Sequence, residues 1–155
     1  MSPLKNSDEE VEARVGRIVQ RLREQGHRIT PQRLAIIQTF ISDPTHPTAE
    51  QIYEGLRQLF PTMAVSTVYN TLGLLVQLGE AVEVSPATRE TRFDPHVADH
   101  CHLVCLRCNA IVDVECPGIV AWEDIRAEAT RRGFKVVRQV HEIYGLCGRC
   151  AGANE

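Results

Sequence analysis

Several features are missing from this chain, and each absence removes a class of protein. No N-terminal apolar segment of the kind that directs export is present, and no apolar run is long enough to span a bilayer. There is no internal repeat or low-complexity segment, and no HExxH motif pairs a general base with a metal site. We therefore expect a cytoplasmic chain with no membrane partner, and a hydrolytic metalloenzyme is a poor fit.

A strong excess of positive charge is also missing. The formal net charge is −3 over 155 residues, which argues against a protein that binds any polyanion. The distribution is uneven, however: residues 13–33 carry six arginines against the single acid Glu24. Arginine suits bidentate contacts with phosphate or guanine, although an ordinary solvated helix face explains such a cluster equally well.

Paired cysteines are the most informative feature that is present. Two Cys-x-x-Cys pairs, Cys105/Cys108 and Cys147/Cys150, are separated by 38 residues. Four thiolates form a tetrahedral Zn²⁺ site, and the two-residue gap lets both sulfurs of a pair face one ion. Without an export signal, zinc is favoured over structural disulfides, and a redox Cys-x-x-Cys pair is the next alternative. Cys101 and Cys116 are interpreted as ordinary small residues.

A second set of possible ligands lies just upstream of these cysteines. It contains oxygen and nitrogen donors at Asp94, His96, Asp99, His100 and His102. Such harder ligands suit a different ion from the thiolate site. One closed site and one mixed site in a single chain suggest a metal-responsive protein more than a metalloenzyme.

Helix signals dominate the first half of the chain. A capping box at Ser7 and Glu10 opens one helix, and Thr30-Pro31 opens another. Two more are predicted from Thr48 to just before Pro61, with Leu59 facing inward, and over about 65–78. Strand-like runs at 81–84 and 91–93 follow, joined by a turn containing Pro86. This order predicts a winged helix whose fourth helix enters a DNA major groove.

The second half predicts a small β-β-α-β module. Strands are expected at 102–105, 111–114 and 134–140, with a helix at 118–132 that stops before Gly133. Zinc would help to hold such a small unit together, and its exposed edges favour pairing with a second copy. The predicted fold class is α+β: a DNA-binding domain at 1–93, a hinge at 94–101 and a dimerisation domain at 102–155.

Five motifs in order resemble the ferric uptake regulator family over about residues 14–150. They are GHRITPQR (26–33), HPTAEQIY (46–53), STVYNTL (66–72), RFD…DHCHLVCLRC (92–108) and HEIYGLCGRC (141–150). The resemblance implies a homodimeric repressor of a palindromic operator and not an enzyme. It also implies structural zinc on the four paired cysteines, and a regulatory Fe²⁺ or Mn²⁺, with Zn²⁺ possible, on His46, Asp94, His100, His102 and Asp113.

Two positions point to a subfamily within this resemblance. Aspartate at 113, with six positions from Asp94 to His100, is most similar to the peroxide-responsive regulators, in which iron-catalysed oxidation of a ligand histidine lifts repression. Asn70 replaces an arginine common in iron-type members. The alternative is a repressor that reports iron, manganese or zinc concentration; a Cys-x-x-Cys redox protein is the alternative of another class.

The sequence also sets limits on the sites. Gln139 stands where the family often has a further histidine, so no third metal site is expected, and His27 and His96 are interpreted as surface or supporting residues. Hydroxyl, amide and guanidinium groups can contact phosphates and base edges. The predicted DNA contacts are Arg28, Arg33, Ser66, Thr67, Tyr69 and Asn70.

Overall fold

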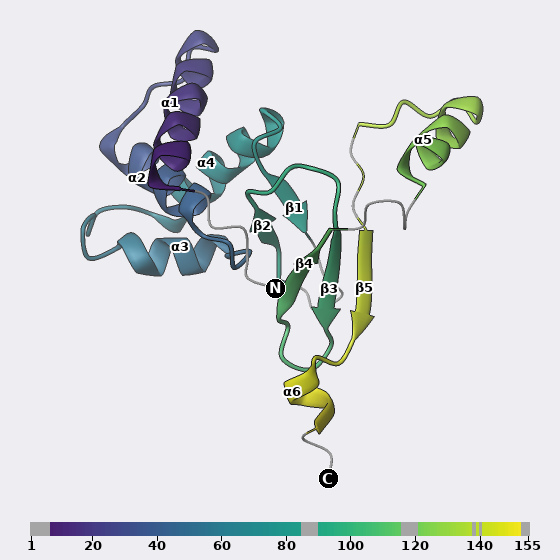
Figure 1. Cartoon of the computed structure of the whole chain (residues 1–155). Helices are drawn as coiled ribbons and strands as arrows, with labels where there is room; N and C mark the ends of the chain where they lie inside the picture. Colours follow the sequence, from purple (N-terminus) through teal and green to yellow (C-terminus); the bar gives the residue numbers. More distant parts are fainter. Residues whose placement is uncertain (1–6, 85–89, 116–120, 138, 140, 153–155) are drawn as a thin grey trace. The chain divides into compact units, whose positions relative to one another are not determined.

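The computed structural model describes residues 7–84, 90–115, 121–137, 139 and 141–152. The chain divides into two compact units, residues 1–97 and residues 98–155, and each is considered by itself (Figure 1). The division falls within the segment 94–101. No helix among the described residues is long and apolar enough to cross a lipid bilayer.

The first unit is built on four helices whose starts follow from their capping residues. α1 (Asp8–Glu24) begins after Ser7, whose hydroxyl accepts from the Glu10 backbone in a capping box. α2 (Pro31–Ser42) begins after Thr30, with proline at its first position. α3 (Ala49–Leu56) has a second capping box at Thr48 and Gln51, whereas α4 (Val65–Gln77) has no side-chain cap.

One apolar core joins these helices. Ile18 of α1, Phe40 of α2, Ile52 of α3 and Leu72 of α4 are all at most 2% exposed and belong to the same cluster. α2 packs on both α3 and α4, and α3 packs on α4. The burial of each helix along a single stripe fixes which side chains remain outside.

A short antiparallel hairpin completes this unit. β1 (Val82–Val84) pairs with β2 (Arg92–Asp94), with Val82 opposite Asp94 and Val84 opposite Arg92. Residues 85–89, with the turn expected at Pro86, lie outside the described residues. Three helices, a fourth helix and a β-hairpin are the elements of a winged helix, so the predicted fold of the N-terminal half is confirmed.

The second unit is a three-stranded sheet with two helices. The strands are β3 (Cys101–Cys105), β4 (Ile111–Val114) and β5 (His141–Gly145), in the spatial order β4-β3-β5. β3 is antiparallel to β4 and parallel to β5. α5 (Trp122–Arg131) lies between β4 and β5 in the sequence, and α6 (Gly148–Ala151) follows β5.

Two details of the predicted elements are wrong. α3 ends at Leu56, and a tight turn in which the Leu59 amide donates to the Leu56 carbonyl carries Leu59 off the apolar stripe. Leu59 is 73% exposed instead of buried. Residues 134–137 form no strand, although their side chains favour one; the strand starts at His141. Residues 134–137 pair with none of the strands in the sheet β4-β3-β5, and β-propensity without a pairing partner is not enough.

Candidate metal and nucleic-acid sites

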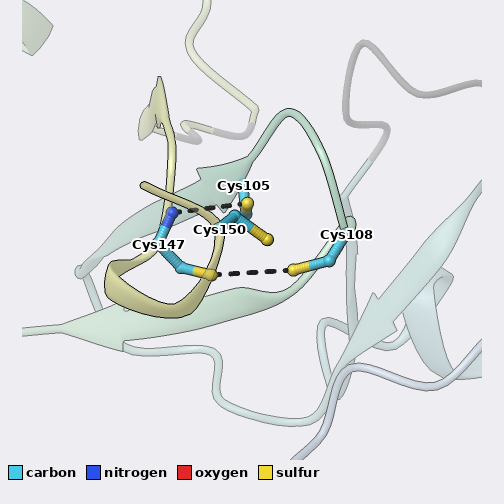
Figure 2. Close-up of side chains that lie close together, drawn as sticks. All are labelled: Cys105, Cys108, Cys147 and Cys150. Carbon is cyan, nitrogen blue, oxygen red and sulfur yellow. Dashed lines mark hydrogen bonds between the residues drawn. The ribbon is translucent and has the colours of Figure 1, made fainter. Parts of the chain in front are cut away.

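Four cysteines converge at one end of the second unit. Cys105 ends β3, Cys108 lies in the following loop, Cys147 caps α6 and Cys150 lies within it (Figure 2). Their sulfur atoms all lie within 4.8 Å of one another, and the Cys108 and Cys147 sulfurs are 3.8 Å apart. A tetrahedron with Zn–S bonds of about 2.3 Å has an edge of about 3.8 Å, so the spacing fits zinc.

The loop between the first pair is shaped for this convergence. Asn109 has a left-handed backbone with φ of 57°, and its amide donates to the Cys105 carbonyl. The Cys105 amide donates in turn to Ala110, which closes the hairpin between β3 and β4. Asparagine tolerates the left-handed region better than most residues. The tight turn is therefore what brings the Cys108 sulfur back beside Cys105.

Backbone amides prepare one of these sulfurs as a thiolate. The Cys147 amide donates to the Cys105 sulfur at 3.3 Å. This contact, with further backbone donors at Cys108 and Arg107, lowers the pKa of Cys105 to about 5. The neighbouring Cys147 thiol and burial raise the pKa of Cys150 to about 12. A cation would relieve the crowding of negative charge. No disulfide joins any of the five described cysteines.

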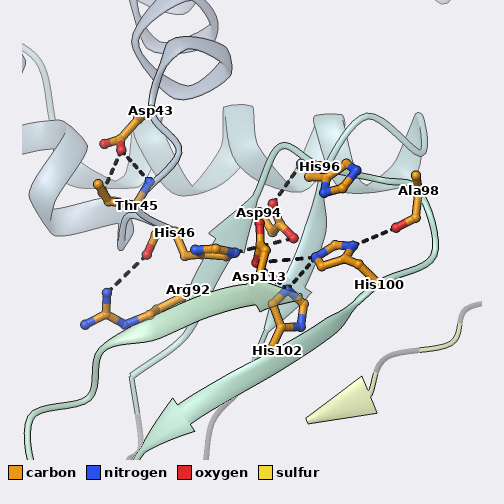
Figure 3. A network of polar contacts seen from close by, with 10 residues as sticks. All are labelled: Asp43, Thr45, His46, Arg92, Asp94, His96, Ala98, His100, His102 and Asp113. Carbon is orange, nitrogen blue, oxygen red and sulfur yellow. Dashed lines mark hydrogen bonds and ion pairs between the residues drawn. The ribbon is translucent and has the colours of Figure 1, made fainter. Parts of the chain in front are cut away.

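The first unit contains a buried histidine–carboxylate pair. His46 Nε2 and Asp94 Oδ2 are 3.5 Å apart, and the two side chains are 2% and 1% exposed (Figure 3). His46 has a left-handed backbone, with φ of 56°, and its carbonyl accepts from Arg92 at 3.2 Å. The Phe93 amide donates to the Pro47 carbonyl, so two hydrogen bonds attach the loop before α3 to β2 beside the pair.

The second unit contains a group of two histidines and a carboxylate. His100 and His102 Nε2 atoms are 2.9 Å apart, and they lie 3.5 and 3.6 Å from Asp113 Oδ1 (Figure 3). His100 Nδ1 lies 2.7 Å from the Ala98 carbonyl. Because a carbonyl can only accept, Nδ1 carries a proton, and in the neutral ring the lone pair of His100 lies on Nε2, beside His102 and Asp113. Imidazole and carboxylate donors of this kind fit Fe²⁺, Mn²⁺ or Zn²⁺.

His96 and Asp99, two of the upstream oxygen and nitrogen donors, and the nearby Cys101 make other contacts. The His96 backbone amide donates to Asp94 Oδ1 at 2.7 Å. Asp99 forms an ion pair with Arg126 of α5 at 2.6 Å. Cys101 is buried in β3, and strand alternation directs its side chain to the sheet face opposite His102. Cys116 lies outside the described residues.

The predicted nucleic-acid residues lie on α4 and before and at the start of α2. Ser66, Tyr69 and Asn70 are exposed along α4, and Thr67 is half-buried, while Val68 between them belongs to the core. Arg28 is exposed, and half-buried Arg33 donates to the Arg28 carbonyl. The outward side of α4 is thus polar and accessible, as base readout requires.

Two acidic residues with long-range contacts in the first unit were missed by sequence reasoning. Glu80 binds Arg14 at 3.3 Å and Arg21 at 2.7 Å, so two of the six clustered arginines are committed to an internal ion-pair network. Glu50, in the first turn of α3, accepts from the Tyr69 hydroxyl. All three contacts join residues far apart in the sequence, and no local pattern signals them.

Comparison with known proteins agrees with this arrangement. The model of the ferric uptake regulator family matches residues 24–144. The peroxide operon regulator of Bacillus subtilis is 42% identical over 130 residues, which are 84% of this chain and 88% of that protein.

Two solved structures are similar as well. One is from a study of peroxide sensing and gene regulation by PerR from Streptococcus pyogenes: it is 36% identical, with a TM-score of 0.51, covering 88% of this chain and 92% of that one. The Helicobacter pylori ferric uptake regulator is 20% identical, with a TM-score of 0.76 and full coverage of both chains, which shows a shared fold. On the match to the family model and the identity to the Bacillus relative, this chain belongs to the ferric uptake regulator family.

Proposed function

We propose that this chain is a metal-dependent transcriptional repressor that senses hydrogen peroxide. The observation that carries the proposal is the group formed by His100, His102 and Asp113, in which an aspartate completes the donor set. Aspartate at 113 is the feature that resembles peroxide-responsive regulators, and the relatives from Bacillus subtilis and Streptococcus pyogenes are named for peroxide response. The chain would thus act as a regulator rather than as an enzyme.

Zinc on Cys105, Cys108, Cys147 and Cys150 would have a structural role. The four sulfurs already converge, and together they join the end of β3 to α6, which follows β5. A closed set of four thiolates leaves no open coordination position for chemistry. Free thiols held for metal suit a reducing compartment, so the proposed location is the cytoplasm.

The regulatory ion would be held by residues of both units. We assign His46 and Asp94 of the first unit, and His100, His102 and Asp113 of the second, to one Fe²⁺ or Mn²⁺ site. An ion that binds donors from two units favours the relative orientation in which all of them reach it. DNA affinity would follow the occupancy of the site, because that orientation sets the placement of the DNA-binding helices in a dimer.

Iron supplies the reactivity toward hydrogen peroxide when it is bound. The contribution of the chain is to place the imidazoles of His46 and His100 where one oxygen atom is added to a ring. An oxidised ring is a poorer nitrogen donor, so the two units lose the orientation that binds DNA and repression is lifted. Manganese at the same residues would support DNA binding without this sensitivity.

A second copy of the chain would complete the molecule. Val112, Leu103 and Ile143 occupy paired positions across β4, β3 and β5, so they share one face of the sheet. They are 54%, 40% and 55% exposed, which is unusual for an aligned apolar row. We propose that a dimer covers this face and presents two α4 helices to the two halves of a palindromic operator.

The proposal is tested by peptide mass spectrometry of the zinc-containing protein loaded with Fe²⁺ or with Mn²⁺. A small excess of hydrogen peroxide should add one oxygen to the His46 or His100 peptide only in the iron form. The same treatment should release the iron form from DNA. Oxygen found only on cysteine or methionine would replace the histidine mechanism with a thiol switch or incidental damage. If peroxide modifies neither form selectively, the result favours a repressor that reports metal concentration.

A further inference from the structure

One hydrogen bond on the accessible side of α4 has a defined direction. The Tyr69 hydroxyl lies 2.7 Å from Glu50 Oε1, and the two residues come from the two helices that pack together in the first unit, α4 and α3. Both side chains are exposed, Tyr69 by 41%. A carboxylate can only accept, so the single hydroxyl proton of Tyr69 is directed at Glu50.

The protonation states of the two groups reinforce this direction. The hydrogen bond from Tyr69 lowers the pKa of Glu50, and the Glu50 carboxylate raises the pKa of Tyr69. Glu50 also lies in the first turn of α3, where the helix dipole favours negative charge. A hydrogen bond to a charged acceptor is about twice as strong as one between neutral groups. The proton is therefore held on the Tyr69 oxygen and directed toward Glu50.

The hydrogen bond to Glu50 limits what the Tyr69 oxygen can contact in DNA. With its proton used, the oxygen offers only lone pairs. Phosphate oxygens, the guanine O6 and N7 atoms and the thymine O4 atom are all acceptors, so they cannot pair with it. The donors that the major groove presents are the exocyclic amines of adenine and cytosine.

We propose that Glu50 is a positioning residue for base specificity: it fixes the Tyr69 hydroxyl as an acceptor, so that α4 selects adenine or cytosine at the base facing Tyr69. The inference rests on the proposed function, in which α4 enters the major groove. Glu50 acts through Tyr69 and need not touch a base. Its charge also opposes a close approach of the DNA backbone at this point, which disfavours registers that would place a phosphate there.

The test is selection of binding sites from a pool of random 30-base-pair duplexes by the full-length protein, loaded with zinc and Mn²⁺. The variants are Glu50→Gln, Tyr69→Phe and the double variant. Glu54→Gln is the matched control, because Glu54 lies on the same helix but forms its ion pair with Arg57, at 2.9 Å. Thermal unfolding and metal content show whether each variant is folded and loaded.

Wild-type protein should enrich a palindromic motif in which, at one position of each half-site, adenine and cytosine are preferred over guanine and thymine on the strand that faces Tyr69. Glu50→Gln and Tyr69→Phe should each weaken that preference at the same position by about 3- to 10-fold, the range expected for one hydrogen bond. The double variant should resemble either single variant, and Glu54→Gln should retain the wild-type motif. A merely structural role for Glu50 would change overall affinity and leave the base preference intact.

Three results would overturn the inference. Retention of the wild-type preference by Glu50→Gln or Tyr69→Phe would show that the hydroxyl does not read a base. Independent effects that add in the double variant would show that Glu50 does not act through Tyr69. Failure of the wild-type protein to enrich any sequence would reject the proposed DNA-binding function itself, and the inference with it.

Discussion

His102 and Asp113 are directly opposite each other on neighbouring strands. The antiparallel register of β3 and β4 pairs these two residues, so their side chains project from the same face of the sheet. The carboxylate lies 3.6 Å from the imidazole nitrogen, while Cys101 and Leu103 on either side of His102 project to the other face. Two donors of the proposed regulatory site are thus set by sheet register rather than by a flexible loop.

Replacing Asp113 with asparagine should remove the regulatory ion and leave the zinc in place. The amide keeps the shape of the side chain but loses its negative charge. Loss of supporting groups around metal ligands already weakens binding about 10- to 100-fold, and a lost ligand should weaken Mn²⁺ binding by at least as much. Electron paramagnetic resonance of free Mn²⁺ measures the affinity, and zinc content is determined on the same sample.

Glu115→Gln provides the control for this experiment. Glu115 is an exposed carboxylate two positions beyond Asp113 along the chain. Its replacement removes one nearby negative charge but no proposed ligand of the ion. Its Mn²⁺ affinity should match that of wild-type protein. Equal affinities for wild-type protein and Asp113→Asn would remove Asp113 from the site.

Removing zinc should unfold the second unit. The cysteine cluster joins elements that are far apart in the sequence, and metal-binding free energy in small zinc domains, about 10–16 kcal/mol, acts as folding free energy. Cys147→Ser should therefore lose zinc and the cooperative unfolding of residues 98–155. Circular dichroism on heating, together with zinc content, would measure both.

Cys101→Ala is the matched variant for the zinc experiment. Cys101 is as well buried as Cys105 but lies outside the sulfur cluster, so its replacement should retain one zinc per chain. Full zinc content in Cys147→Ser would contradict the assignment of that sulfur as a ligand.

The ion pairs of Glu80 should stabilise the first unit more than a solvent-exposed pair does. Glu80 and Arg14 side chains are only 19% and 18% exposed, and Arg14 also donates to the Glu80 carbonyl. We expect Glu80→Gln to lower the free energy of unfolding by about 1.5–3 kcal/mol, as for hydrogen bonds to charged groups. Urea unfolding of the full chain, followed by helix content, measures the change.

A surface pair on α3 supplies the comparison. Glu54 and Arg57 are 64% and 55% exposed, and such pairs contribute about 0–1 kcal/mol. Glu54→Gln should therefore destabilise the protein less than Glu80→Gln does. The reverse order would mean that the network around Glu80 contributes little to folding.

Arg28 should contribute to DNA affinity through phosphate. The logarithm of the binding constant falls linearly with the logarithm of salt concentration, and each neutralised phosphate adds about 0.9 to the steepness of that slope. Arg28→Ala should therefore reduce this slope by about that amount and weaken binding similarly for all sequences. Fluorescence anisotropy with an enriched duplex, at several salt concentrations, gives the slope.

Arg57→Ala is the control for this measurement, since Arg57 is exposed and paired with Glu54. Arg57→Ala removes one positive charge, as Arg28→Ala does, but Arg57 is not a predicted DNA contact. The slope for Arg57→Ala should therefore equal that of wild-type protein. An unchanged slope in Arg28→Ala would place Arg28 outside the interface.

Local patterns predicted the elements that have local causes. Ser7, Thr30 and Thr48 act through hydrogen bonds to residues three positions away, so the helix starts could be read from a few neighbouring letters. The Cys-x-x-Cys spacing is local in the same sense, and only the meeting of the two pairs needed the fold. Strands β3 and β4 were predicted from the runs HLVC (102–105) and IVDV (111–114), which are local patterns around the first Cys pair.

Features that depend on distant partners were not predictable. Residues 134–137 have the composition of a strand, yet a strand forms only where an edge accepts it. The pairing of Tyr69 with Glu50, and of Glu80 with Arg14, depends on how α4 and α1 pack against the rest of the first unit. The resemblance of the motifs, rather than periodicity, suggested His46 as a ligand, because that residue is isolated in the sequence from the other donors.

The turn at Asn109 connects the two kinds of metal chemistry in the second unit. It closes the hairpin whose alignment places Asp113 beside His102, and Cys105 and Cys108 lie within the same turn. A slip of one position would set His102 against Val112 or Val114 and rotate one strand's side chains to the wrong face. The length of the turn that carries Cys105 and Cys108 therefore determines how ligands several residues away are aligned. One residue inserted between Cys108 and Ile111 would abolish the histidine–aspartate pairing while every ligand remained in the sequence.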